Sequence, residues 1–331
     1  MNNNNDMKSK TISVVMCTYN GEKFIREQLD SILRQTLPAD EIIIQDDCST
    51  DNTYNILCEY QQNHSIIHVY RNSRNIGINP NFFNAISKAT GDYIAIADQD
   101  DIWEDYKLEL QVNNIGEKLL CGGRSVPFST TNEEVRVDMR IPNYNLIRWL
   151  FIGSISGHTM LFSRQLLEKM PPATDISPLR FYDAILGMVA AAYDDIIYIE
   201  KTLVHHRRHI SSVTLTKPTD NTMTLKNIYK NVIRTWKFHK KLKPEISKRL
   251  HVTHSFLNQI DSKEPILKDA KRMIELYTSK SLLDFLRLVI FCIQHYDCLF
   301  YTKVNKFAGI PRAIYFPISL SEYYRYLLNK Q

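Results

Sequence analysis

Apolar and polar positions follow two alternating periods along the first hundred residues. Short β-branched runs such as "TISVVMCTY" (11–19) have the length of buried strands. Each run precedes a stretch whose apolar residues recur every three or four positions; in "GEKFIREQLDSILRQT" (21–36) these are Phe24, Ile25, Leu29, Ile32 and Leu33. Strands that alternate with helices predict βαβ units on a parallel sheet, and therefore an α/β fold.

The same alternation continues to residue 100. It predicts strands in "DEIIIQDD" (40–47) and "IIHVYRN" (66–72), each followed by a helix, and a fourth strand at Tyr93–Ala97. The helix before the fourth strand, "NPNFFNAISKATG" (79–91), is expected to end with Gly91 just beyond its C-cap.

Beyond Leu110 the periodicity weakens. A strand and a short helix are expected in 157–170, a helix in 181–193 and a strand in 194–209, and from about Thr224 the pattern is mostly helical. We therefore predict three parts, which are a disordered polar tail at 1–10, a catalytic domain at 11–215 and a basic, mostly helical C-terminal extension at 216–331.

Composition and charge restrict the class of protein. The chain is 44% hydrophobic and 23% charged, which is typical of a soluble domain. The tail lacks the apolar segment of a secretory signal, and the six cysteines have no metal-site spacing, so we expect reduced thiols and a cytoplasmic protein. Residues 1–215 carry 20 basic against 27 acidic residues (net −7), and residues 216–331 carry 21 against 9 (net +12). The basic part could meet nucleic acid or an anionic membrane.

An acidic cluster, "DQDD" (98–101), directly follows the fourth predicted strand. The carboxyl ends of strands in α/β sheets usually hold ligands. Carboxylates crowded there repel one another unless solvent screens them or a cation binds among them. Two interpretations stay open at this point, a divalent-cation site and an acidic turn in which Asp101 caps a helix beginning near Trp103.

Three loops are expected to share one cleft, because the ends of parallel strands converge. They are "TYNGE" (18–22), "DDCSTDNT" (46–53) and "DQDD". Together with the later "GHTMLF", "FYD" and "HHRRH", they occur in the order and at the spacing found in inverting glycosyltransferases of family 2. The chain resembles that family, specifically its rhamnosyltransferase-like branch, from about Thr11 to Val213. The resemblance implies the GT-A fold with a helical C-terminal extension.

The resemblance also implies roles for residues on the donor side. Asp98 would meet the ribose of a UDP- or dTDP-sugar, and Asp100 would bind Mg²⁺ or Mn²⁺. Asp101 would touch that ion through water or only cap the helix. Arg71 and Arg74 could reach the base or the phosphates, although solvated surface arginines would look the same. The residues implied for the nucleoside pocket are Thr18, Tyr19 and Asp46.

An inverting transfer also needs a base on the opposite face of the sugar. By resemblance this base is Asp183 in "RFYDAILG", and the alternative is an ordinary helix N-cap. Arg207 corresponds to a clamp on the diphosphate and His209 to a phosphate or metal contact, although "HHRRH" could also be an exposed basic turn. Gly157 and His158 correspond to the acceptor side, where a buried structural role for His158 remains open.

The basic extension contains two stripes at helical spacing between residues 225 and 241. One stripe is apolar and includes Trp236, and the other includes Lys226, Lys230 and Arg234. This helix could pack on the domain with a solvated face, or lie on an anionic membrane. The run "LLDFLRLVIFCI" (282–293) is too short to span a bilayer and is expected in a core or an interface.

These features predict a metal-dependent inverting glycosyltransferase of bacterial surface polysaccharide synthesis. Its partners would be a nucleotide-sugar donor and a glycan or lipid-linked acceptor, with possible contact at the inner face of the membrane and no nucleic acid. A nucleotidyltransferase is the enzymatic alternative, but "CTYNGEKF" has only Gly21 where such enzymes carry a Gly-rich loop. A receiver-type binding module is the non-catalytic alternative, and it would not account for Asp183.

Overall fold

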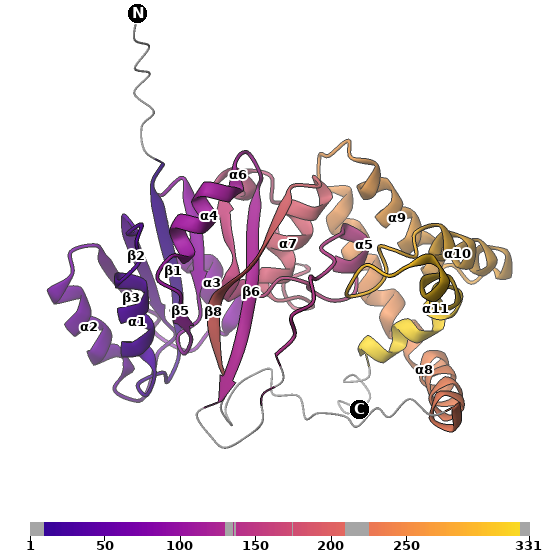
Figure 1. The fold of residues 1–331 in the computed structure, drawn as a ribbon, viewed down its shortest axis with the longest axis horizontal. Helices are drawn as coiled ribbons and strands as arrows, with labels where there is room; N and C mark the ends of the chain where they lie inside the picture. The colour runs from indigo at the N-terminus through magenta and orange to yellow at the C-terminus, as the bar shows by residue number, and fades with distance from the viewer. Residues whose placement is uncertain (1–9, 130–134, 136, 174, 209–224, 325–331) are drawn as a thin grey trace, which may run out of the picture. The chain divides into compact units, whose positions relative to one another are not determined.

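One eight-stranded sheet gathers strands from distant stretches of the chain (Figure 1). Its order is β3-β2-β1-β4-β7-β6-β8-β5. The four strands predicted within the first hundred residues are confirmed, and they pair in parallel as β3-β2-β1-β4; they are β1 (Ile12–Thr18), β2 (Glu41–Asp46), β3 (Ile67–Arg71) and β4 (Tyr93–Ala97). The remaining strands are β5 (Ile102–Trp103), β6 (Leu120–Ser129), β7 (Leu161–Ser163) and β8 (Ile196–Arg208).

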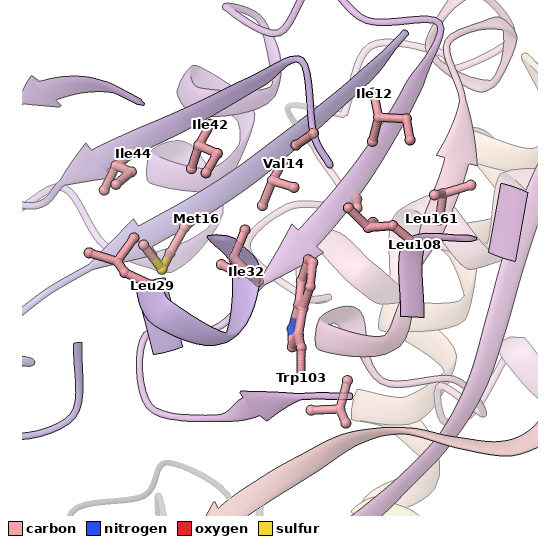
Figure 2. Close-up of a cluster of buried hydrophobic side chains, with 14 of the residues drawn as sticks. Ile12, Val14, Met16, Leu29, Ile32, Ile42, Ile44, Trp103, Leu108 and Leu161 are labelled. Carbon is pink, nitrogen blue, oxygen red and sulfur yellow. The ribbon is translucent and has the colours of Figure 1, made fainter. Parts of the chain in front are cut away.

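Helices cover both faces of β1, β2 and β4, which explains why these strands are nearly continuous apolar runs, whereas the edge strand β3 is largely exposed. Side chains alternate across a strand, so Ile12, Val14 and Met16 of β1 point to one face. There they join a buried cluster with residues of α1 (Ile25–Leu33), α2 (Thr53–Asn63) and α4 (Lys107–Ile115), part of which is shown in Figure 2. Helix α3 (Ile78–Ile86) packs on β1 and β2 and buries Phe82, Ala85 and Ile86.

Two local expectations are wrong. No helix begins near Trp103, because Ile102 and Trp103 pair antiparallel with His205 and Val204 of β8, and α4 begins only at Lys107. Gly91 does not end α3 either. That helix ends at Ile86, and the amide of Gly91 instead donates to the Ser13 hydroxyl at 2.7 Å, where a Cβ would meet the backbone of Ser13 at 2.6 Å.

The structure is a computed structural model. It describes residues 10–129, 135, 137–173, 175–208 and 225–324. The chain divides into two units. The first comprises Met1–Asp138, Ser156–Glu168 and Ile196–His209, and the second Met139–Ile155, Lys169–Asp195 and Ile210–Gln331. The first unit contains the whole sheet, the short helix η1 (Gly157–Thr159) and α6 (Gln165–Glu168). The predicted domain boundary at residue 215 stays a prediction.

The second unit is helical. Trp149 of α5 (Leu146–Trp149) is buried, and its ring lies so close to Gly187 of α7 (Tyr182–Ala192) that a Cβ there would meet it at 2.3 Å. The predicted helical extension is present as α8 (Leu225–Asn258), α9 (Pro265–Thr278), α10 (Leu282–Gln294) and α11 (Lys306–Ser319). Among the residues described, no helix combines the length and the apolar character needed to cross a bilayer.

Candidate active site

Three parallel strands end at one edge of the sheet, and the predicted donor loops begin there. The pairing register puts Thr18 of β1 beside Asp46 of β2, and Asp46 beside Arg71 of β3. Strand β4 pairs with the other side of β1 and is followed directly by Asp98. The register therefore brings the first three predicted loops together, as the βαβ pattern implied.

Asp46 is fully buried and anchors this edge. Its Oδ1 accepts from the hydroxyl of Thr18 at 3.0 Å, and its Oδ2 accepts from the amide of Ser49 at 3.0 Å and lies 3.4 Å from Nε of Arg71. Thr18 is buried as well. These two residues therefore shape the floor of the site. The ring of Tyr19, which is 45% exposed, is the part of this group that a ligand can reach.

Gln99 joins the first loop to the acidic cluster. Its Oε1 accepts from the Tyr19 amide at 2.9 Å, and its Nε2 donates to the Tyr19 carbonyl at 3.1 Å. This two-bond clamp passes close to Gly21, where a Cβ would stand 2.4 Å from Oε1 of Gln99. A side chain at this position would therefore displace the end of the Gln99 side chain and break the clamp.

The second loop is organised by turn chemistry. Asp47 is buried, and its carboxylate accepts from the amides of Ile76 at 2.8 Å and Gly77 at 2.9 Å. Asp51 accepts from the amide of Thr53 at 3.0 Å at the start of α2. Arg74 is exposed and precedes Ile76 by two residues. Its contact with a donor stays a prediction.

Asp101 is the centre of a buried cluster that the pairing of β5 with β8 assembles. Its Oδ1 lies 3.1 Å from Nδ1 of His206 and accepts from the amide of Arg207 at 3.0 Å. Its Oδ2 lies 3.5 Å from Nδ1 of His158, and that ring nitrogen is also 3.3 Å from Oδ2 of Asp98. The other ring nitrogen of His158 lies 2.9 Å from the Ser125 hydroxyl.

Electrostatics keep this carboxylate ionised. Burial acts to raise the pKa of Asp101, but the charge of His158, the hydrogen bond with His206 and the amide of Arg207 outweigh it and hold the pKa below its ordinary value. The carboxylate does not act as the helix cap considered from the sequence, because the residue at the N-cap of α4 is Tyr106.

A metal ion is one possible occupant of this region. Within the residues described, ligand atoms of Asp101, His158 and His206 lie within 4.8 Å of one another, and the buried Oδ2 of Asp101 accepts no hydrogen bond. The two imidazoles are stacked, however, with planes 7° apart and centroids 5.0 Å apart. Stacked rings direct their in-plane lone pairs side by side and not at a common point. This group therefore fits a divalent cation held by the Asp101 carboxylate and at most one of the two imidazoles.

Arg207 is buried, in contrast to the exposed basic turn considered from the sequence. Its guanidinium lies between the rings of Phe24 and Phe128, 4.6 and 4.7 Å from their centroids. Nε donates to the main-chain carbonyl of Asp100 at 2.8 Å, and Nη2 donates to Glu27 at 2.6 Å. Arg207 thus stabilises the backbone of the acidic cluster through its hydrogen bond to the Asp100 carbonyl.

The other predicted residues are distributed as follows. Asp98 and Asp100 are half-buried at the end of β4, and Gly157 and His158 are buried in η1 of the same unit. Asp183 belongs to the second unit, in the first turn of α7, where Oδ1 accepts from the Ala184 amide at 2.7 Å. It is not the N-cap, because that position is Phe181. His209 lies outside the described residues.

Four residues that contact the candidate site were not predicted from the sequence, namely Gln99, His206, Glu27 and Ser125. Gln99 and His206 lie inside motifs that had been singled out, so their positions were a usable signal. Glu27 and Ser125 carried none. They are single polar residues on α1 and β6 whose importance depends on contacts with Arg207 and His158, which are far away in the sequence.

Comparison with known proteins gives a consistent result. A family model described as "Glycosyl transferase family 2" matches residues 13–170. An uncharacterized glycosyltransferase of Methanocaldococcus jannaschii is 30% identical over 212 residues, which are 61% of this chain and 72% of that protein. The putative teichuronic acid biosynthesis glycosyltransferase TuaG of Bacillus subtilis is 38% identical over 120 residues, covering 36% of this chain and 45% of its own length. Other curated relatives are matched over 62% of their length.

The fold has a counterpart among solved structures. Residues 1–349 of TarS from S. aureus superpose with a TM-score of 0.55, at 17% sequence identity, over 95% of this chain and 89% of that one. The predicted GT-A fold is therefore confirmed.

Proposed function

The chain belongs to glycosyltransferase family 2, and from that premise we propose that it transfers a sugar, with inversion, from a UDP- or dTDP-sugar to a hydroxyl group. The observation that carries the proposal is the meeting of the β1, β2 and β4 ends. There an exposed Tyr19 ring, a half-buried Asp98 and a half-buried Asp100 lie on a rigid, hydrogen-bonded base.

The donor half of the site provides the groups that a nucleotide sugar needs. The Tyr19 ring can pack along the base, and the Asp98 carboxylate can accept hydrogen bonds from ribose hydroxyls. Asp100 would hold Mg²⁺ or Mn²⁺, with the predicted help of His209. Such an ion would neutralise charge on the departing nucleoside diphosphate. A role for Arg74 and Arg207 in donor binding is part of the proposal, and Arg207 would act through its hold on Asp100 and Glu27.

We assign the acceptor side to Gly157 and His158, and the role of catalytic base to Asp183. Asp183 would take the proton of the acceptor hydroxyl as the new bond forms. Its place in the first turn of α7 favours the ionised form, because the helix N-terminus stabilises negative charge. The link to surface glycans is supported by the teichuronic acid relative. A lipid-linked or polymeric acceptor at the inner face of the membrane stays part of the proposal.

The Asp183→Asn variant tests the assigned base. Asparagine keeps the shape of the side chain and can still accept from the Ala184 amide, but it cannot take a proton. Donor affinity, measured by calorimetry, should survive, and the transfer rate should fall by about 10² to 10⁴.

Asp195→Asn is the matched control, since Asp195 follows the opposite end of the same helix. It should transfer at nearly the wild-type rate. Equal rates for Asp183→Asn and wild type would remove Asp183 from the mechanism.

A further inference from the structure

Two helices of the second unit, α10 and α11, are apolar on more than the side they bury. Leu288, Phe291 and Cys292 form the buried side of α10. Gly309, Ala313, Phe316 and Pro317 form the buried side of α11. The two helices pack on each other (Figure 1). A helix of a soluble protein normally turns a polar face to water once such a side is buried.

The sides of the two helices that face solvent are also apolar. On α10, Leu282, Leu286 and Ile290 follow one another at a spacing of four residues and are 76%, 52% and 54% exposed, with Leu283 beside them at 55%. On α11, Phe307 is 94% exposed and Ile314 is 49% exposed, with an exposed Pro311 between them. These residues are named the exposed stripes of α10 and α11.

The charges around the stripes have one dominant sign. Residues 280–319 contain five basic residues and two acidic ones, a net charge of +3. Of the acidic pair, Asp284 is bound to Arg287 at 3.0 Å and to the Ser279 hydroxyl at 2.8 Å. Lys303 and Lys306 are exposed next to the α11 stripe. An apolar surface flanked by basic side chains is complementary to an anionic lipid bilayer.

The helices are too short to cross a bilayer. They have 13 and 14 residues, about 20 Å at 1.5 Å per residue, against a hydrocarbon core of about 30 Å. We propose that the exposed stripes of α10 and α11 bind the surface of an anionic lipid bilayer, with Lys303 and Lys306 at the headgroups. This surface is distinct from the Trp236 stripe of α8 considered from the sequence, and the inference does not depend on sugar transfer.

The test is co-sedimentation of the full chain with vesicles of phosphatidylglycerol and phosphatidylcholine, beside vesicles of phosphatidylcholine alone. The apolar variants are Leu286→Gln with Ile290→Gln and Phe307→Ser with Ile314→Gln. The charge variant is Lys303→Gln with Lys306→Gln. All six positions are exposed, so folding should be preserved, and thermal unfolding verifies this. Trp236→Gln is the matched control, because Trp236 is 59% exposed on α8.

We expect the wild type to bind the phosphatidylglycerol vesicles and to bind phosphatidylcholine vesicles far less. Each apolar pair should weaken binding by about tenfold or more, and the charge pair by about tenfold to thirtyfold at low salt. Trp236→Gln should bind as the wild type does.

Three results would overturn the inference. The first is wild-type protein that does not bind phosphatidylglycerol vesicles. The second is folded apolar variants that bind these vesicles as well as the wild type does. The third is a loss of vesicle binding that occurs only in Trp236→Gln. Light scattering supplies a fourth. A stable dimer that the apolar substitutions dissociate would show that a second copy covers these stripes.

Discussion

Lys107 is a charged side chain enclosed in the first unit. It is fully buried, and its Nζ lies 3.7 Å from the centroid of the Trp103 ring. That amine makes no hydrogen bond with the residues described. Burial lowers the pKa of Lys107 to about 7, against a smaller opposing effect of Cys121. In the unfolded chain the same amine has its ordinary pKa of about 10.4.

The sign of the resulting pH dependence follows from these two pKa values. Between about pH 7 and pH 10 the unfolded chain binds a proton that the folded chain releases, so the free energy of unfolding should rise with pH. Below about pH 7 the folded chain also holds the proton, so the free-energy cost of burying the charged amine has its full value. Lys107→Met should therefore be more stable than wild type by about 1–4 kcal/mol at neutral pH, and the gain should shrink toward pH 10. Urea unfolding across this range measures it, and a variant that is destabilised at every pH would contradict it.

Asp100 is the residue on which the metal hypothesis rests. Asp100→Asn replaces an anionic ligand by a neutral amide, so the Mn²⁺ concentration needed for half-maximal donor turnover should rise by about tenfold or more. Asp105→Asn is the control, because Asp105 is an exposed acid whose partner is Arg34 at 3.6 Å. If Asp100→Asn kept full turnover at limiting Mn²⁺, the assignment would be wrong.

At the scale of single residues, the sequence predicted where the acidic site residues lie in the fold better than it predicted which residues they contact. Asp98 and Asp100 stand out because they crowd at a strand end, and the structure has both there. The same reasoning assigned Asp101 to a cap or a water-mediated metal contact, whereas it is buried against His158 and His206. Those partners lie 57 and 105 residues away in the sequence, and no local pattern encodes such pairing.

At the scale of elements, the regular βαβ units were predictable and the irregular pairings were not. Strands β1, β2 and β4 are recognisable in the sequence by their buried apolar runs. Strand β5 has only two residues, and it exists because β8 offers a partner. Strand β6 pairs with β8 through a register shift at Gly123, where a Cβ would meet Leu203 at 2.3 Å. Tertiary pairing of this kind overrides local propensity.

The clamp between Gln99 and the Tyr19 loop gives a prediction at this scale. In Gly21→Ala the new Cβ displaces the end of the Gln99 side chain, and both hydrogen bonds to Tyr19 are lost. Donor KM should rise by about threefold to tenfold with little change in stability, since the clamp holds a loop and not the core. Gln99→Ala should have the same effect.

The double variant separates a shared mechanism from two independent ones. If both substitutions act by releasing the same clamp, their effects on donor KM should not add. Fully additive effects would show that Gly21 and Gln99 act separately.

At the scale of the whole molecule, the sequence indicated an α/β catalytic part and a helical basic part, and the GT-A fold and the C-terminal helices are confirmed. It did not indicate that residues 139–155 and 169–195 group with the C-terminal helices. Those stretches interrupt the sheet sequence between β6 and β7 and between α6 and β8, where the apolar periodicity was weak. Their burial, as at Trp149 against Gly187, depends on packing partners that are distant in the chain.

The most direct test of the account uses the whole protein and a panel of nucleotide sugars. Purified chain is incubated with UDP-, dTDP- and GDP-sugars in the presence of Mn²⁺, and mass spectrometry follows the slow release of nucleoside diphosphate by hydrolysis. We predict release from a UDP- or dTDP-sugar, strongly reduced at limiting Mn²⁺ in Asp100→Asn and retained in Asp105→Asn. Protein that neither binds nor hydrolyses any nucleotide sugar, with or without Mn²⁺, would contradict the proposed function.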